Sequence, residues 1–178
     1  MRKGNIPLLG GLLGMAVGMA TSPPPLQTVG RVDLNRYIGK WYEIARYPNR
    51  FERNCDRDVT AEYSIRTDGK IRVLNSCVTT AGKHKKADGT AVIVDKKTNA
   101  KLKVTFFWPF YGKYWIIDLG NDYEYAAVGE PSRGYLWILS RSPALPDATY
   151  QKILSRLSEQ GYRPSKLVRS RQTAAAPQ

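Results

Sequence analysis

The sequence predicts an all-β protein: an eight-stranded antiparallel up-and-down β-barrel with a C-terminal α-helix packed on its outside. From residue 41 onward, short runs rich in β-branched and aromatic residues are separated by Gly, Pro, Asn and Asp turns. No helical pattern lies between these runs, so neighbouring strands should pair antiparallel. Eight such strands can close on themselves, which removes the free sheet edges and leaves room inside for one small ligand.

The chain opens with the features of a secretory signal. Met1-Arg2-Lys3 precedes an apolar stretch that ends in the small-x-small site Gly18-Met19-Ala20. We therefore predict a signal peptide over 1–20 and a flexible, proline-rich arm over 21–31. No cysteine precedes Cys55, so a lipid-modified cysteine is not expected. The prediction is an exported, soluble protein, periplasmic or secreted.

The predicted strands then follow in order. They cover residues 41–46, 59–65, 71–77, 90–94, 101–106, 114–119, 123–128 and 135–141. An Asp68-Gly69 turn joins the second and third strands into a hairpin. Cys55 precedes the second strand and Cys77 ends the third, so this hairpin brings both to its open end. In an exported chain we expect a Cys55–Cys77 disulfide.

A helix is predicted after the last barrel strand. Pro146 suits a first helical position and Gly161 suits a C-terminal stop. Between them, the apolar stripe that should face the barrel consists of Tyr150, Ile153, Leu154 and Leu157. Lys166–Arg169 could form a short ninth strand, and 172–178 is predicted to be a disordered tail.

Three motifs give the chain a resemblance to a known family. The run 39–46, Gly-Lys-Trp-Tyr-Glu-Ile-Ala-Arg, resembles the opening motif of the lipocalins. Asn121-Asp122-Tyr123 resembles their second motif and Arg141 their third, and the likeness covers about residues 32–171. Within the family, the chain is similar to bacterial lipocalins of the outer-membrane lipoprotein type and to apolipoprotein D, but it lacks their lipoprotein cysteine.

The resemblance implies which end of the barrel is closed. Structural residues would meet there, with Arg141 lying over the face of Trp41. These residues are Gly39, Trp41, Asp122, Tyr123 and Arg141. The ligand is then expected in the cavity and at the opposite end.

Alternation along the strands predicts the ligand-binding residues. Their side chains should point inward and form a largely apolar cavity with a few polar groups. The candidates are Tyr63, Val73, Asn75, Val104, Phe106, Trp115 and Ile117. For the fourth, seventh and eighth strands, the pattern does not decide which side chains point inward.

The loop after the fifth strand should add an exposed aromatic rim at the open end. Phe110 and Tyr111 are its ligand-binding candidates, and Arg50 and Arg53 in the first loop could attract an anionic head group.

The predicted function is binding, with storage or transport, of a small amphipathic lipid such as a fatty acid or lysophospholipid, in the service of envelope maintenance. The formal net charge of +13 adds peripheral contact with an anionic membrane surface as a second partner class. The oligomeric state, monomer or dimer, stays open. No cofactor is expected, and two cysteines with the single His84 are too few for a closed zinc site.

Three alternatives have weaker support. Haem or another tetrapyrrole would find only His84 as an axial ligand. An enzyme on the same scaffold lacks a Gly-x-Ser-x-Gly motif, and the spacing of a carboxylate pair such as Glu43 with Asp118 does not recommend it. Nucleic-acid binding, suggested by the charge and by the run 113–115, conflicts with export and with the even spread of Lys and Arg. We therefore predict no enzyme and no nucleic-acid partner.

Overall fold

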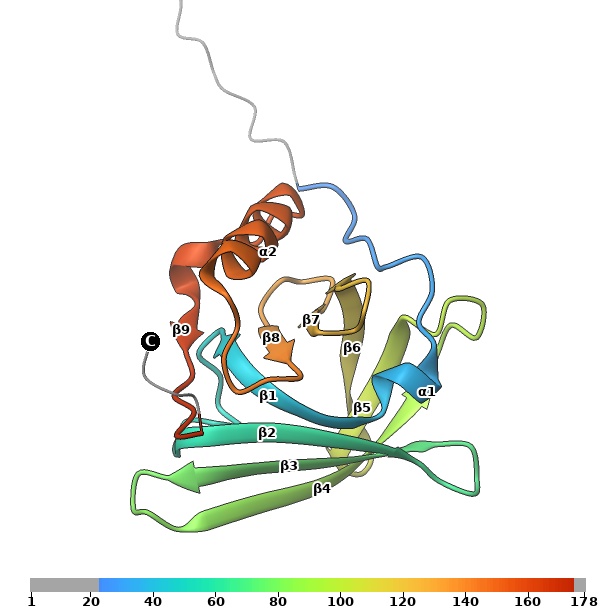
Figure 1. Ribbon diagram of the computed structural model, residues 1–178. Coiled ribbons are helices and arrows are strands. Elements are labelled where there is room, and N and C mark those ends of the chain that lie inside the picture. The colour runs from blue at the N-terminus through green and yellow to red at the C-terminus, as the bar shows by residue number, and fades with distance from the viewer. Residues whose placement is uncertain (1–22, 175–178) are drawn as a thin grey trace, which may run out of the picture.

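Antiparallel strands form a closed barrel in the computed structural model, which describes residues 23–174 (Figure 1). Each strand pairs with the next one, and β1 pairs with both β8 and β2, which closes the sheet. The strands are β1 Gly39–Arg46, β2 Cys55–Ile65, β3 Ile71–Thr79, β4 His84–Ile93, β5 Lys101–Phe107, β6 Phe110–Leu119, β7 Tyr125–Gly129 and β8 Leu136–Ser140. The predicted fold class is confirmed. A short extra strand, β9 Val168–Arg169, pairs with β1.

The β2–β3 hairpin carries the predicted disulfide. Cys55 and Cys77 are bonded, with their Cα atoms 5.7 Å apart, so this prediction is confirmed. The next strand differs from the prediction, because β4 begins at His84 and not at residue 90. His84 pairs with Val78, so the lysine-rich segment that reads as a loop is an exposed continuation of the sheet.

Helix α2, Asp147–Glu159, lies on the outside of the barrel (Figure 1). Tyr150, Ile153 and Leu157 are buried and pack in one cluster with Ile117 and Ile138 of the barrel wall. Pro146 is the N-cap of the helix, one position before its predicted place. A 3₁₀ turn, Pro164–Lys166, leads from the helix to β9.

Both ends of the described chain are packed against the barrel, contrary to the predicted flexible arm and, at Gln172, to the predicted tail, whose residues 175–178 lie outside the described residues. Leu26 is buried in the cluster beneath α2, and the backbone N–H of Val29 donates to the carbonyl of Ile116 at 3.0 Å. Gln172 is also buried, and its side chain donates to the carbonyls of Glu43 and Val59 at 2.9 and 2.8 Å. The predicted signal peptide, 1–20, lies outside the described residues.

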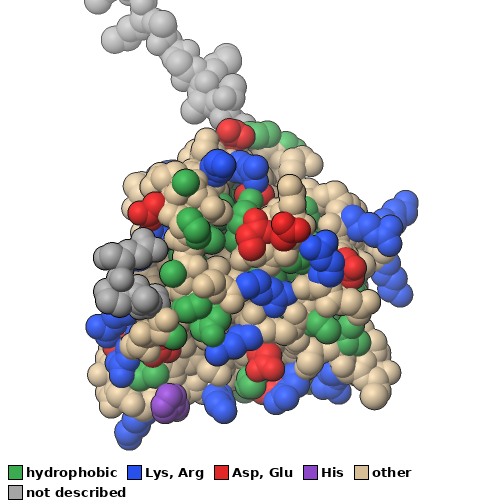
Figure 2. Space-filling model, viewed as in Figure 1, with side chains coloured by type: hydrophobic (Ala, Val, Ile, Leu, Met, Phe, Trp, Pro, Cys, Tyr) green, Lys and Arg blue, Asp and Glu red, His purple; other side chains and the backbone are tan. Residues whose placement is uncertain are grey.

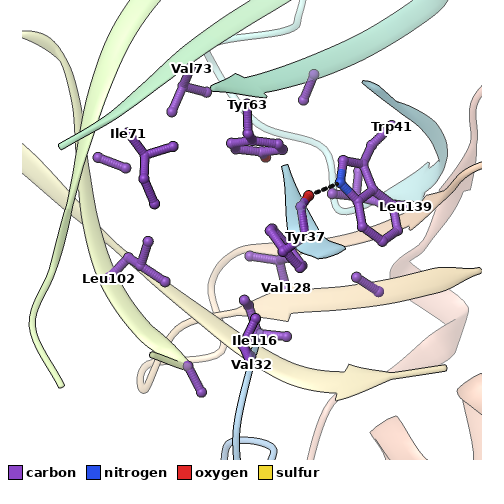
Figure 3. Close-up of a cluster of buried hydrophobic side chains, with 14 of the residues drawn as sticks. Val32, Tyr37, Trp41, Tyr63, Ile71, Val73, Leu102, Ile116, Val128 and Leu139 are labelled. Carbon is purple, nitrogen blue, oxygen red and sulfur yellow. Dashed lines mark hydrogen bonds between the residues drawn. The ribbon is translucent and has the colours of Figure 1, made fainter. Parts of the chain in front are cut away.

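The main core fills one end of the barrel, beside the short helix α1, Leu34–Tyr37. Figure 3 shows its buried side chains. Trp41 is fully buried there, and its indole Nε1–H donates to the carbonyl of Tyr37 at 2.8 Å. None of the helices between residues 23 and 174 is long and apolar enough to cross a membrane.

Candidate functional site

The barrel encloses a cavity of about 90 Å³, here called the larger cavity. Phe106 at the end of β5 and Glu52 in the β1–β2 loop contribute to its wall, so it lies toward the end of the barrel opposite α1. A second space of about 10 Å³, the deep void, lies beneath it against Leu34 and Ile38. We call the end that holds the β1–β2 loop the mouth.

Five of the predicted ligand-binding residues line the larger cavity. They are Tyr63, Val73, Asn75, Val104 and Phe106. They come from β2, β3 and β5, where polar and apolar residues alternate and one face must point inward. Figure 3 shows Tyr63 and Val73 directed into the barrel interior.

The predicted inward direction of Trp115 and Ile117 is wrong. Ile117 is buried in the cluster beneath α2, and Trp115 packs against the same cluster with Lys101 Nζ 4.6 Å from its ring centroid. Their neighbours Tyr114 and Ile116 face the interior instead. The reason is that α2 covers the outer face of β6, so both faces of this strand are apolar. The alternation of polar and apolar residues therefore cannot show which side chains of β6 point inward.

Phe110 and Tyr111 line neither space. They belong to the β5–β6 hairpin, where Phe107, Trp108 and Phe110 are exposed to 77%, 78% and 72%. We call these three residues the aromatic tip. The ammonium group of Lys103 lies 4.7 Å from the ring centroid of Tyr111, so positive charge accompanies the exposed rings.

The two head-group candidates also lie outside the cavity. Arg50 and Arg53 are exposed, and the guanidinium of Arg50 lies 5.1 Å from the ring centroid of Phe51. The arginine that approaches the cavity wall is Arg46, which was not among the predicted site residues. No sequence pattern marks it, because its contact with Glu52 forms only when the β1–β2 loop folds back over β1.

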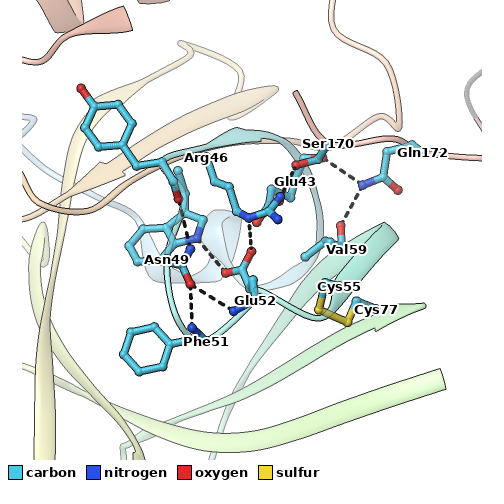
Figure 4. Close-up of polar contacts among 12 residues, drawn as sticks. Glu43, Arg46, Asn49, Phe51, Glu52, Cys55, Val59, Cys77, Ser170 and Gln172 are labelled. Carbon is cyan, nitrogen blue, oxygen red and sulfur yellow. Dashed lines mark hydrogen bonds and ion pairs between the residues drawn. A yellow bond between two sulfur atoms is a disulfide. The ribbon is translucent and has the colours of Figure 1, made fainter. Parts of the chain in front are cut away.

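Arg46 joins two glutamates at the mouth (Figure 4). Its Nη1 lies 3.0 Å from Glu43 Oε1, and its Nε lies 3.0 Å from Glu52 Oε2. The indole Nε1–H of Trp137 donates to the other oxygen of Glu52 at 2.9 Å, and Ser170 contacts Glu43. Glu43, Glu52 and Trp137 all line the larger cavity. We call this set the mouth network.

Burial raises the pKa of Glu43 well above its ordinary value, and the neighbouring carboxylate of Glu52 adds to the effect. Removing a carboxylate from water disfavours its charged form, and a like charge nearby does the same. Arg46 contacts both carboxyl groups, so neither glutamate lies beside the apolar cavity without a cationic partner.

Replacing Glu43 with glutamine should remove a pH dependence of stability. A raised carboxyl pKa stabilises the folded state below the ordinary value of 4.5, and this contribution is lost as the pH rises through the folded-state pKa. We expect Glu43→Gln to gain stability relative to wild type as the pH increases above 4.5, with a slope of at most about 1.4 kcal/mol per pH unit. Urea unfolding at several pH values measures it.

The matched control is Glu62→Gln, because Glu62 is an exposed glutamate of β2. Its stability difference from wild type should stay flat over the same pH range. A flat difference for Glu43→Gln as well would contradict the raised pKa of Glu43.

Three tyrosines meet between the larger cavity and the deep void. The hydroxyl of Tyr114 lies 2.7 Å from that of Tyr37 and 2.9 Å from that of Tyr63. Tyr63 and Tyr114 line both spaces, whereas Tyr37 lines only the deep void. We call this group the tyrosine cluster.

The residues assigned to the closed end gather there in the structure. The guanidinium of Arg141 lies 3.8 Å from the ring centroid of Trp41 and donates to the carbonyls of Lys40 and Tyr37 at 2.9 and 3.1 Å. Gly39 has φ of +94°, a conformation that favours glycine, with Arg141 beside it.

The second motif, which contains Asp122 and Tyr123, also lies at the closed end of the barrel. The hydroxyl of Tyr123 accepts from the backbone N–H of Asp33 at 2.8 Å, and Asp122 lies 4.0 Å from Arg36. Of these residues, none lines either cavity.

Other chemistries find little support in the described part of the chain. Residues 23–174 contain no group of three His, Cys, Asp or Glu side chains placed to hold a metal ion. Asp118 pairs with Arg156 of α2 at 3.0 Å, beneath the helix, while Glu43 belongs to the mouth network. The carboxylate pair weighed in the sequence is therefore not formed. His84 is exposed and lines neither space.

Comparison with known proteins gives one consistent family. The lipocalin-like domain matches residues 32–172. The chain is 42% identical to outer membrane lipoprotein Blc of Citrobacter freundii over 92% of each chain. It is 37% identical to apolipoprotein D of Macaca fascicularis over 79% of each chain. The solved structure of insecticyanin from Manduca sexta is similar with a TM-score of 0.70, 25% identity and coverage of 88% of this chain and 89% of that one.

Proposed function

The chain belongs to the lipocalin family, whose members bind small hydrophobic ligands and generally act as carriers, and on that premise we propose that it binds and stores or transports a small amphipathic lipid. We favour a fatty acid or a lysophospholipid as the ligand. Binding of this lipid would serve maintenance of the cell envelope. The observation that carries the proposal is the larger cavity, whose wall is mostly apolar and lies inside a closed barrel.

Binding would work by partition of the acyl chain. Val73, Val104, Phe106 and Leu139 offer an apolar wall, and each Å² of apolar surface that leaves water stabilises the complex by about 25 cal/mol. The mouth network adds polar groups to the wall, and both of its carboxyl groups contact Arg46. The exposed Arg50 and Arg53 lie outside, where they could screen an anionic head group.

The ligand can be identified directly. The protein purified from its native compartment should yield an amphipathic lipid on extraction with organic solvent and mass spectrometry. Titration with acyl ligands should quench the fluorescence of Trp137, which lines the larger cavity. A barrel that carries no lipid and shows no quenching with any acyl ligand would refute lipid binding.

Nucleic-acid binding is the weaker proposal. A strand-binding surface needs positive charge gathered along a groove. On the face in Figure 2, Lys and Arg are scattered and interspersed with Asp and Glu. Export of the protein, which we propose from its N-terminal segment, also disagrees with a nucleic-acid partner.

We also propose that the aromatic tip touches an anionic membrane surface, from which the ligand would enter the mouth. Exposed aromatic rings insert at the membrane interface, and Lys103 and Lys113, which pair across β5 and β6, would add attraction to anionic lipids. Replacing both Trp108 and Phe110 with serine should weaken binding to phosphatidylglycerol vesicles about tenfold, since two apolar contacts are lost. Vesicle co-sedimentation measures it.

Val94→Ser is the control for this experiment, because Val94 is 61% exposed but follows β4 at the opposite end of the barrel. It should leave vesicle binding unchanged. Equal binding of the double serine variant and wild type would remove the aromatic tip from the membrane proposal.

A further inference from the structure

The tyrosine cluster holds three hydroxyl protons but only two hydrogen bonds between its hydroxyl groups. Three hydroxyls carry three protons, and the two contacts between them, at 2.7 and 2.9 Å, each use one. Burial raises the pKa of Tyr37 and Tyr114 well above the usual range and that of Tyr63 to about 12, so all three stay protonated. Within residues 23–174 the third proton has no acceptor.

The unpaired proton can be placed by considering the three donor patterns. Tyr114 can give its proton to only one neighbour, so the free proton lies on Tyr63, on Tyr37, or on Tyr114 when both others donate to it. Two of these patterns put it on Tyr63 or Tyr114, which line the larger cavity. A buried donor without an acceptor is costly, so an acceptor supplied by a ligand stabilises these patterns.

A second unpaired polar atom lies on the same cavity wall. Asn75 Oδ1 is buried without a hydrogen-bond partner among the described residues. Asn75 is two residues from Val73, which is the strand partner of Tyr63, so all three face the larger cavity. The wall between the mouth network and the tyrosine cluster is thus prepared for polar atoms of a ligand and not for hydrocarbon alone.

The charge of the complementary group follows from the lining. Among the described residues that line the two spaces, none is Lys or Arg. An anion placed beside the tyrosine cluster would be buried with no cationic side chain in the wall around it, which is far more costly than burying a neutral carbonyl. A fatty acid that enters methyl end first would leave the proton unpaired.

We propose that the tyrosine cluster is a hydrogen-bond donor subsite at the floor of the larger cavity, selecting an uncharged acceptor oxygen, such as a ketone or ester carbonyl, on the end of the ligand that enters first. The proposal rests on the proposed lipid-binding function and narrows it, because a lipid with an uncharged oxygen on the end that enters first would be preferred to a simple fatty acid. A ligand with this oxygen satisfies the free proton, and one without it does not.

The test compares two ligands of the same shape: methyl nonyl ketone and the alkene in which a CH₂ group replaces the carbonyl oxygen. Competition with the fluorescent fatty acid cis-parinaric acid gives both dissociation constants. The double variant Tyr63→Phe/Tyr114→Phe removes both hydroxyls that line the larger cavity. We expect its preference for ketone over alkene to fall about tenfold relative to wild type, as for one lost hydrogen bond.

Tyr42→Phe is the matched control, because Tyr42 lies in β1 and lines neither the larger cavity nor the deep void. It removes one phenolic hydroxyl outside the tyrosine cluster, so the ketone preference should match wild type. A fall in Tyr42→Phe equal to that in the double variant would overturn the donor subsite.

Two outcomes separate this proposal from the proposed function. If cis-parinaric acid binds but the double variant keeps the wild-type preference, the donor subsite is refuted and lipid binding stands. If cis-parinaric acid does not bind to wild type, both fail. If the double variant does not fold, infrared spectroscopy of an isotope-labelled ketone bound to wild type tests the proposal, because the carbonyl band reports whether its oxygen accepts a hydrogen bond. This band should shift to lower frequency relative to the ketone in alkane, and an unshifted band would overturn the proposal.

Discussion

Replacing Trp41 with alanine should lower the free energy of unfolding by about 3–5 kcal/mol, as deletion of a large buried aromatic side chain does. Trp41 is fully buried at the closed end, where its indole also donates to the carbonyl of Tyr37 at 2.8 Å. The variant would open a cavity, leave that carbonyl with only its hydrogen bond from Arg141, and remove the ring on which the guanidinium of Arg141 lies at 3.8 Å. Urea denaturation monitored by circular dichroism measures the loss.

Trp108→Ala makes the same chemical change at a position that is 78% exposed on the aromatic tip. Its unfolding free energy should stay within about 0.5 kcal/mol of wild type, as for surface substitutions in general. Similar losses in the two variants would show that Trp41 does not hold the closed end, and its role there would have to be abandoned.

The strands that could be assigned correctly from the sequence are those with one wet face. On β2, β3 and β5 polar and apolar residues alternate, so Tyr63, Val73 and Val104 could be predicted to face the cavity. On β6 the run 114–117 is apolar throughout, because one face meets the barrel interior and the other meets α2. A register shift between Ile116 and Asp118 also displaces the alternation. No local pattern could therefore separate Tyr114 from Trp115.

The mouth network could not be predicted for a different reason. Glu43 lies in a strand and Glu52 in a loop, and each alone reads as a solvated surface charge. They become a buried set only through Arg46 and through the C-terminal segment that brings Ser170 to Glu43. Gln172, the first residue of the tail predicted over 172–178, is also buried, and its side chain donates to the carbonyls of Glu43 in β1 and Val59 in β2. Long-range contacts of this kind leave no periodic signal in the sequence.

Filling the larger cavity should weaken ligand binding nearly a hundredfold. Ala61 is a buried residue of β2 that lines this cavity, and Ala61→Phe would place a phenyl ring in a space of about 90 Å³. A ligand that can no longer bury roughly 100 Å² of acyl surface loses about 2.5 kcal/mol, or nearly a hundredfold in affinity. Titration with cis-parinaric acid measures the loss, and the ring should occupy the cavity at a stability cost of at most about 1–3 kcal/mol.

The matched control for that loss is Ala81→Phe, which adds the same ring at an exposed position in the β3–β4 turn. Its affinity for cis-parinaric acid should equal that of wild type, and its fluorescence change should be the same. If Ala61→Phe folds, as judged by thermal unfolding, and still binds with wild-type affinity, then the acyl chain lies elsewhere. The exposed rings of the aromatic tip would then be the next surface to test, because the described residues there are apolar and uncovered.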